Sequence, residues 1–136
     1  MNILVTGPRG GELPAGLVAM ATMAVKDYAR QLGISRLKTN IHLRLHNALS
    51  IDDAEGLCEA VDNRNFIVDV CMFTNWLGTL AHEMVHVKQY ARNELDEYMT
   101  RWKSRTNVCD LDYSDQPWEK EAFRLQDRMM LEFINR

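Results

Sequence analysis

Cysteine is scarce in this sequence, and the cysteines present show no pairing pattern. The 136 residues include three, Cys58, Cys71 and Cys109, without C-x-x-C spacing. An odd, unpaired set argues against a disulfide framework and against a zinc site built from cysteines. We therefore expect the protein to work in a reducing compartment, the cytoplasm.

Long apolar runs and an excess of positive charge are also missing. Residues 13–25 are mostly apolar, but their helical spacing continues past Lys26 and Asp27, which predicts an internal amphipathic helix rather than a signal peptide. No run approaches the roughly 20 apolar residues that span a bilayer, so no membrane segment is expected. The net charge of −3 argues against a general nucleic-acid-binding surface. The basic run 101–105 is interpreted as a solvated segment.

The remaining composition is typical of a single globular domain. Hydrophobic residues make up 46% of the chain and charged residues 26%, which is ordinary for a folded protein. A chain of this length can bury one core and is too short for two. We therefore expect one domain that spans residues 1–136.

The spacing of apolar residues predicts an α+β fold. Strands are expected at residues 3–5 and 41–46, and a hairpin at 57–61 and 66–72 around a polar turn. Helices are expected at residues 17–32 and 75–92 and from Pro117 onward. The glycine-rich residues 7–11 lack the G-K-[ST] ending of a phosphate-binding loop and are interpreted as a flexible turn. The expected arrangement is a small antiparallel or mixed sheet packed on the 75–92 helix, with one helix before it and one after.

Residues 82–86 read H-E-x-x-H within the predicted 75–92 helix. Residues four apart on a helix lie about 40° apart around its axis, so His82 and His86 can reach one metal ion. Glu83, beside them, can take a proton from a water that the metal activates. The histidines lie opposite the apolar stripe of this helix, so we expect them to face a cleft or solvent. That stripe consists of Leu77, Leu80, Ala81, Met84, Val87 and Ala91.

The other two histidines do not extend this site. His42 and His46 are also four apart, but on a strand this spacing separates them by about 13 Å. They cannot then share a metal ion, and we interpret them as surface or cleft-lining residues.

A catalytic zinc site needs a third protein ligand and one open position. The chain lacks the H-E-x-x-H-x-x-G-x-x-H extension, so the third ligand must come from elsewhere, and residues 117–122 are the candidate region. On a helical wheel Glu119 falls within the apolar arc of the last helix, where an unpaired carboxylate is unfavourable and a cation would compensate it. Glu121 falls outside that arc, as an exposed residue that pairs with neighbouring arginines. Glu119 is preferred, and Glu121 remains the alternative.

These two segments together resemble a known family. Residues 80–90, LAHEMVHVKQY, followed by residues 117–122, PWEKEA, are similar to small gluzincin-like metallopeptidases of bacteriophages and bacteria. The resemblance covers the second half of the chain and the preceding hairpin. It implies a zincin-like fold, zinc held by His82, His86 and Glu119, and a cytoplasmic location in a bacterium or an infected cell. Several such families carry an aspartate where this chain has Phe123, so the residues that orient the histidines are unassigned.

The resemblance and the motif together predict zinc-dependent hydrolysis of peptide bonds. Glu83 is the expected general base, and the expected partner is a peptide or protein substrate, which could align along the edge of the hairpin. Tyr113 and Tyr98 are candidate hydrogen-bond donors to the oxyanion. The alternative is a zinc-binding interaction or accessory protein without peptidase activity. Glu83 argues against that alternative, because structural zinc needs no general base.

Overall fold

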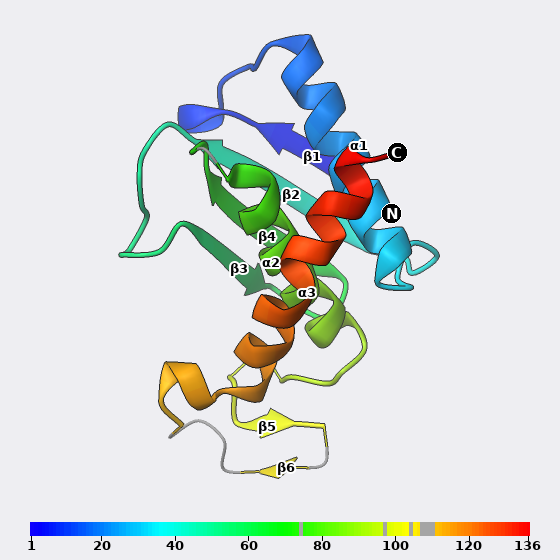
Figure 1. Ribbon diagram of the computed structural model, residues 1–136, viewed down its shortest axis with the longest axis vertical. Helices are drawn as coiled ribbons and strands as arrows, with labels where there is room; N and C mark the ends of the chain where they lie inside the picture. Colours follow the sequence, from blue (N-terminus) through cyan, green and yellow to red (C-terminus); the bar gives the residue numbers. More distant parts are fainter. Residues whose placement is uncertain (74, 97, 104, 107–110) are drawn as a thin grey trace.

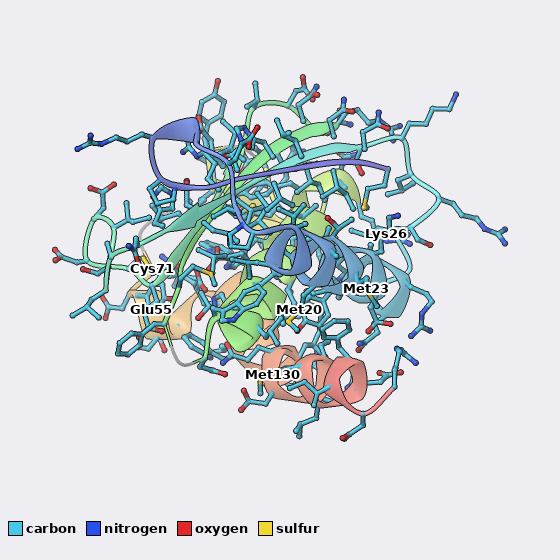
Figure 2. All side chains as sticks on the ribbon, turned by 90° about the horizontal axis from the view of Figure 1, so that it is seen from above. Met20, Met23, Lys26, Glu55, Cys71 and Met130 are labelled. Atoms are coloured by element: carbon cyan, nitrogen blue, oxygen red, sulfur yellow. The ribbon has the colours of Figure 1, made fainter. Side chains whose placement is uncertain are left out.

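The computed structural model describes residues 1–73, 75–96, 98–103, 105–106 and 111–136. In these residues a four-stranded mixed sheet carries three α-helices on one of its faces (Figures 1 and 2). The α+β fold class expected from the sequence is therefore confirmed. In the view of Figure 2 the sheet is the upper layer, α1 (Ala15–Gln31) and α2 (Trp76–Ala91) lie below it in the picture, and α3 (Pro117–Ile134) forms the outermost layer.

The sheet combines parallel and antiparallel pairing in the order β1-β2-β4-β3. The strands β1 (Asn2–Thr6), β2 (Asn40–His46) and β4 (Asn65–Cys71) run parallel to one another. The edge strand β3 (Gly56–Ala60) pairs antiparallel with β4 through the expected hairpin, which begins and ends one residue earlier than predicted. The antiparallel edge strand β3 thus directly precedes β4, and β4 leads into α2, the helix that carries the H-E-x-x-H motif.

Strand β2 shows the alternation that the sequence predicted. Its apolar residues are buried in the core against the helices, whereas its polar residues lie on the open face of the sheet. On that face His42 Nε2 lies 2.9 Å from the Thr6 hydroxyl, and His46 Nε2 lies 2.6 Å from a carboxylate oxygen of Asp69. Arg44 also donates two hydrogen bonds to Asp69. The two histidines therefore contact different partners, as their spacing on a strand requires.

The three helices begin and end close to their predicted bounds. They are α1 (Ala15–Gln31), α2 (Trp76–Ala91) and α3 (Pro117–Ile134). Gly33, two residues beyond α1, has a φ of +73°, a left-handed conformation that favours glycine after a helix. Proline occupies the first turn of α3, where its missing N–H leaves no internal hydrogen bond unmade.

Helix α2 is enclosed by the sheet on one side and by α3 on the other. The expected apolar stripe does contact the core, but the opposite side is covered as well. His82 and His86 are therefore only 6% and 7% exposed. Of the two expected positions, a cleft or solvent, the cleft agrees with the structure: α3 packs over the polar side of α2, and both histidines line a cavity beside the edge strand.

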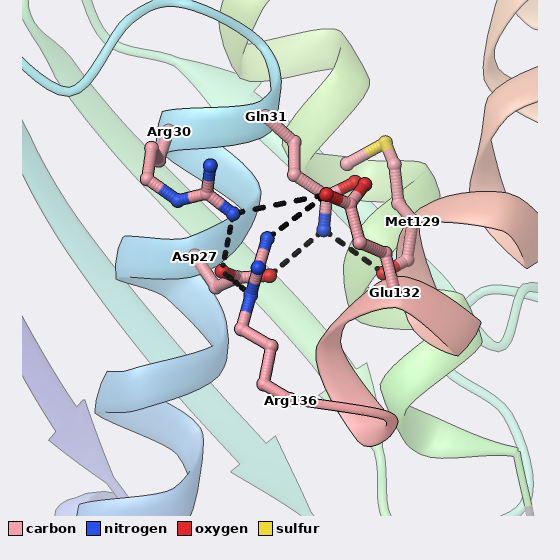
Figure 3. Close-up of polar contacts among 6 residues, drawn as sticks. All are labelled: Asp27, Arg30, Gln31, Met129, Glu132 and Arg136. Carbon is pink, nitrogen blue, oxygen red and sulfur yellow. Dashed lines mark hydrogen bonds and ion pairs between the residues drawn. The ribbon is translucent and has the colours of Figure 1, made fainter.

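A polar cluster fastens the end of α3 to α1 (Figure 3). The Gln31 amide donates to the backbone carbonyl of Met129 at 3.0 Å and to Asp27 at 2.8 Å. Arg136 pairs with Asp27 and, at 3.0 Å, with Glu132. At the opposite end of α3, Trp118 is buried. Both ends of the outer helix are therefore anchored, which fixes its first turn over α2.

The structure differs from two local expectations based on the sequence. Residues 7–11 contain a short 3-10 helix, Pro8–Gly10, where a flexible turn was expected. The basic run contributes the strands β5 (Arg101–Trp102) and β6 (Arg105–Thr106) of a small hairpin. Trp102 is buried there, with its ring centroid 6.3 Å from that of Trp118. The run is thus only partly solvated, because its tryptophan packs beneath the start of α3.

Cys58 and Cys71 are free thiols, and Cys109 lies outside the described residues. Among the residues that the structure describes, no helix has the length and apolarity needed to cross a membrane.

Candidate metal centre

The structure brings the three predicted ligands together. Glu119, in the first turn of α3, places one carboxylate oxygen 2.9 Å from His82 Nε2 and 3.1 Å from His86 Nε2. The three ligand atoms all lie within 4.8 Å of one another. Two imidazole nitrogens and one carboxylate oxygen, converging from two helices, are a donor set that suits a divalent transition metal.

Glu121 occupies a different environment from the one expected. Its carboxylate accepts hydrogen bonds from Lys88 Nζ at 2.9 Å and from the Gln89 amide at 3.0 Å. Its side chain is only 13% exposed. The prediction of an exposed residue paired with arginines was wrong, because α3 turns this position towards the end of α2. The geometry around Glu119 agrees with the preferred assignment of the third ligand, and Glu121 stabilises the helix contact.

Two glutamines orient the histidine rings. Gln89 Oε1 lies 2.7 Å from His86 Nδ1, and Gln126 Oε1 lies 2.7 Å from His82 Nδ1. An amide oxygen only accepts, so each Nδ1 carries a hydrogen and each Nε2 is directed at Glu119. The Gln89 amide is held in place because its nitrogen donates to the Trp118 carbonyl and to Glu121. Amides thus do the orienting here that carboxylates do in many metal sites.

Sequence reasoning missed both glutamines, although a signal was present. Gln89 follows His86 by three positions on the same helix, and Gln126 follows Glu119 by seven. Both spacings keep the residues on one helix face. Phe123 stands where several similar families carry an aspartate. Its ring packs edge-on against His82, with the ring centroids 4.6 Å apart.

Glu83 lies beside the cluster, at the boundary of two cavities. One cavity, of about 160 Å³, contains the three ligand side chains, and the other, of about 480 Å³, extends along α2 towards its N-terminus. Glu83 lines both and is 6% exposed. Burial raises the pKa of its carboxyl above the usual value, although the neighbouring His86 and His82 act in the opposite direction. A buried carboxylate with a raised pKa suits proton transfer.

Gly56 allows the edge strand to pass close to this glutamate. A Cβ atom at this position would lie 2.6 Å from Thr79 Cγ2 and 3.0 Å from Glu83 Cγ. A side chain at this position would therefore have to displace the side chains of Thr79 and Glu83. The glycine is a further site residue that the sequence did not single out.

The two tyrosines proposed as donors have different positions. Tyr113 lines both cavities, and its hydroxyl donates to Glu119 at 3.3 Å. Tyr98 is 80% exposed and lines neither cavity. Tyr113 therefore remains a candidate donor, whereas Tyr98 is too exposed to contribute to this site.

Without a metal ion, a proton between His86 and Glu119 holds the cluster together. Burial lowers the pKa of His86, but its hydrogen bond to Glu119 and the charges of Glu83 and Glu119 outweigh burial and raise the pKa to about 9. Burial alone would raise the pKa of Glu119, but the two histidines hold it down at about 2. A carboxylate and an imidazole nitrogen are both acceptors, so a cation must lie between them. Either a proton or a metal ion can serve.

We expect the His86–Glu119 pair to stabilise the metal-free protein most between about pH 4.5 and 6.5. Above this range His86 loses its proton more readily when unfolded, at a pKa of 6.5, than when folded, at about 9, so stability is lost as the pH rises. Below it, Glu119 is protonated in the unfolded chain at a pKa of 4.5 but resists protonation in the fold down to about 2. Each limb should amount to roughly 3 kcal/mol, because the folded and unfolded pKa values differ by about 2.5 for each group and one pKa unit corresponds to about 1.4 kcal/mol.

Urea unfolding of chelator-treated protein across this pH range measures the effect. Glu119→Gln is the matched variant and should flatten both limbs, since it removes the partner of both histidines. A stability that does not change between pH 6 and 9 would contradict the protonated pair.

Comparisons with known proteins gave no lead: no family model, curated protein or solved structure matched this chain. The chemistry of the site itself must therefore indicate the function.

Proposed function

We propose that this protein is a zinc-dependent metallopeptidase of zincin-like fold, acting on a peptide or protein substrate. The observation that carries the proposal is the position of one Glu119 oxygen between His82 Nε2 and His86 Nε2, with a buried Glu83 at the same cleft. Two imidazoles and one carboxylate match the ligand set of hydrolytic zinc sites, which leave one position open. When bound, zinc would polarise the substrate carbonyl and lower the pKa of the attacking water.

Glu83 supplies the proton chemistry. Its carboxylate accepts the proton of the attacking water and then delivers it to the leaving amine. The raised pKa of the buried carboxyl favours this exchange near neutral pH, since the group is a stronger base than an exposed glutamate. The Tyr113 hydroxyl, which lines the same cleft, can donate a hydrogen bond to the developing oxyanion.

The edge of β3 aligns the substrate. β3 is the last strand of the sheet, so its outer backbone groups are available to pair with an extended peptide. Gly56, at its start, brings this edge within van der Waals distance of Glu83. A peptide added to the strand would therefore run past the general base, with its backbone held parallel to the cleft.

Hydrolysis of unfolded peptides by the zinc-loaded protein tests the proposal. We expect close to one zinc per chain by elemental analysis, and cleavage that a chelator abolishes and added zinc restores. His82→Ala should lose tight zinc binding, whereas the control His42→Ala, on the open face of the sheet, should keep it. Failure to bind zinc would refute the metal site. Stoichiometric zinc without cleavage of any peptide would instead favour the interaction protein.

A further inference from the structure

We propose that the 480 Å³ cavity beside the candidate metal centre binds a positively charged group of the substrate, next to the bond that is cleaved. This inference rests on the proposed peptidase function. The cavity shares Gly56, His82, Glu83 and Tyr113 with the cavity that contains the ligand side chains. A substrate that runs along β3 past Glu83 would place one of its groups there.

Carboxylates surround this cavity. Asp53 and Glu55 come from the segment that precedes β3, and Glu83 contributes from α2. Glu55 lies on the side of the molecule opposite Lys26 of α1 (Figure 2). Among the described residues that line the cavity there is no lysine or arginine to neutralise these charges. Asp53 and Glu55 are exposed, and no ion pair is formed by either within the described part of the chain.

Glu83 indicates that the cavity is more than a group of surface acids. Its side chain is more than nine-tenths buried and is directed into the cavity. It has no hydrogen-bond partner within the described residues, whereas both ring nitrogens of the neighbouring His82 have partners and one oxygen of Glu119 contacts both histidines. In the proposed reaction this carboxylate serves the attacking water, and its negative charge at the wall of the cavity adds to those of Asp53 and Glu55 in attracting a cationic group.

The remaining walls suit an alkylammonium or guanidinium group. Phe123 and Tyr113 stand edge to face at 6.2 Å and are both more than half exposed, so their rings can cover an alkyl chain and attract its cationic end. The side chains of Asn75 and Gln126 also line the cavity and can accept hydrogen bonds. The volume accommodates a lysine or arginine side chain, or the terminal ammonium of a peptide.

Bound zinc does not cancel this preference. Its two positive charges are offset by the carboxylates of Glu119 and Glu83, which leaves Asp53 and Glu55 uncompensated. Because these two residues are exposed, each contributes modestly and the effect is screened by salt. We therefore expect a selectivity of roughly tenfold at low ionic strength.

Four labelled peptides that share an alanine-rich sequence test the inference on the zinc-loaded protein. Three are N-acetylated and carry lysine, glutamine or glutamate at one central position, and the fourth carries glutamine and a free N-terminus. The first three distinguish a cationic side chain from neutral and acidic ones, and the fourth distinguishes a terminal ammonium. Selectivity is measured as kcat/KM, or as the Kd from fluorescence anisotropy for peptides that are not cut.

The lysine peptide, or the peptide with a free N-terminus, should be preferred about tenfold over acetylated glutamine, and glutamate should be the poorest. The cavity variant, which combines Asp53→Asn with Glu55→Gln, lacks both exposed carboxylates, and its preference should fall to within about twofold. A control that removes two negative charges elsewhere, Glu12→Gln with Glu132→Gln, should retain it. Equal values for all four peptides, or a preference that survives the cavity variant, would overturn the inference. Failure of the proposed peptidase function is recognised separately, by binding without cleavage.

Discussion

Replacing Glu83 by glutamine is expected to reduce peptide hydrolysis by about 10²–10⁴-fold while leaving zinc binding and the fold intact. An amide has nearly the same shape as the carboxylate but cannot accept the proton of the attacking water. The tight contact between Gly56 and the Glu83 side chain is preserved by glutamine, because the Cγ atom stays in place. Single-turnover hydrolysis of a cleaved peptide, with zinc content measured on the same sample, checks both parts of the expectation.

Glu132→Gln provides the matched control for this substitution. It removes the same charge from the far end of α3, where Glu132 pairs with Arg136, and should leave the rate unchanged. If Glu83→Gln cleaved the peptide as fast as the unsubstituted protein, Glu83 would not be the general base.

Glu119→Ala is expected to weaken zinc binding by at least about 100-fold, since it removes one of three protein ligands. The same change at Glu121 should alter zinc affinity far less. It should instead destabilise the fold by about 1–3 kcal/mol, because the buried Gln89 amide and Lys88 lose an acceptor. Zinc titration against a chromophoric competitor measures affinity, and urea unfolding of the metal-free proteins measures stability.

The comparison of these two variants decides the third ligand. Unchanged affinity in Glu119→Ala together with a large loss in Glu121→Ala would reverse the assignment. The retained fold of each variant is checked by circular dichroism, so that a loss of zinc is not mistaken for unfolding.

Local pattern was sufficient to predict most elements of the fold. The alternation in β2 and the helical spacing of α1, α2 and α3 arise from the burial of one side of each element, and they are visible without knowledge of the partners. The turn of the β3–β4 hairpin is likewise encoded locally: Asp62 accepts hydrogen bonds from the backbone N–H groups of Arg64 and Asn65. Such features depend on neighbours close in sequence.

The choice of Glu119 over Glu121 shows both the strength and the limit of this reasoning. The wheel placed Glu119 on the buried side of α3, and its contacts with His82 and His86 agree with that placement. The same wheel treated Glu121 as exposed. It failed because Lys88 and Gln89 belong to another helix, and a wheel contains no information about a second surface.

The sequence by itself determined the residue types of the candidate site and the helix that holds two of them. The spacing of His82 and His86 places both rings on one side of a helix whatever the rest of the chain does, because the helical repeat is fixed by the backbone. The tertiary structure alone decided what meets that side. The packing of α3 on α2 brought Glu119, Gln126 and Glu121 to their partners, and the close passage of β3 at Gly56 gave the cleft its wall. These contacts join residues more than 20 positions apart, so they depend on how the layers pack rather than on any local periodicity.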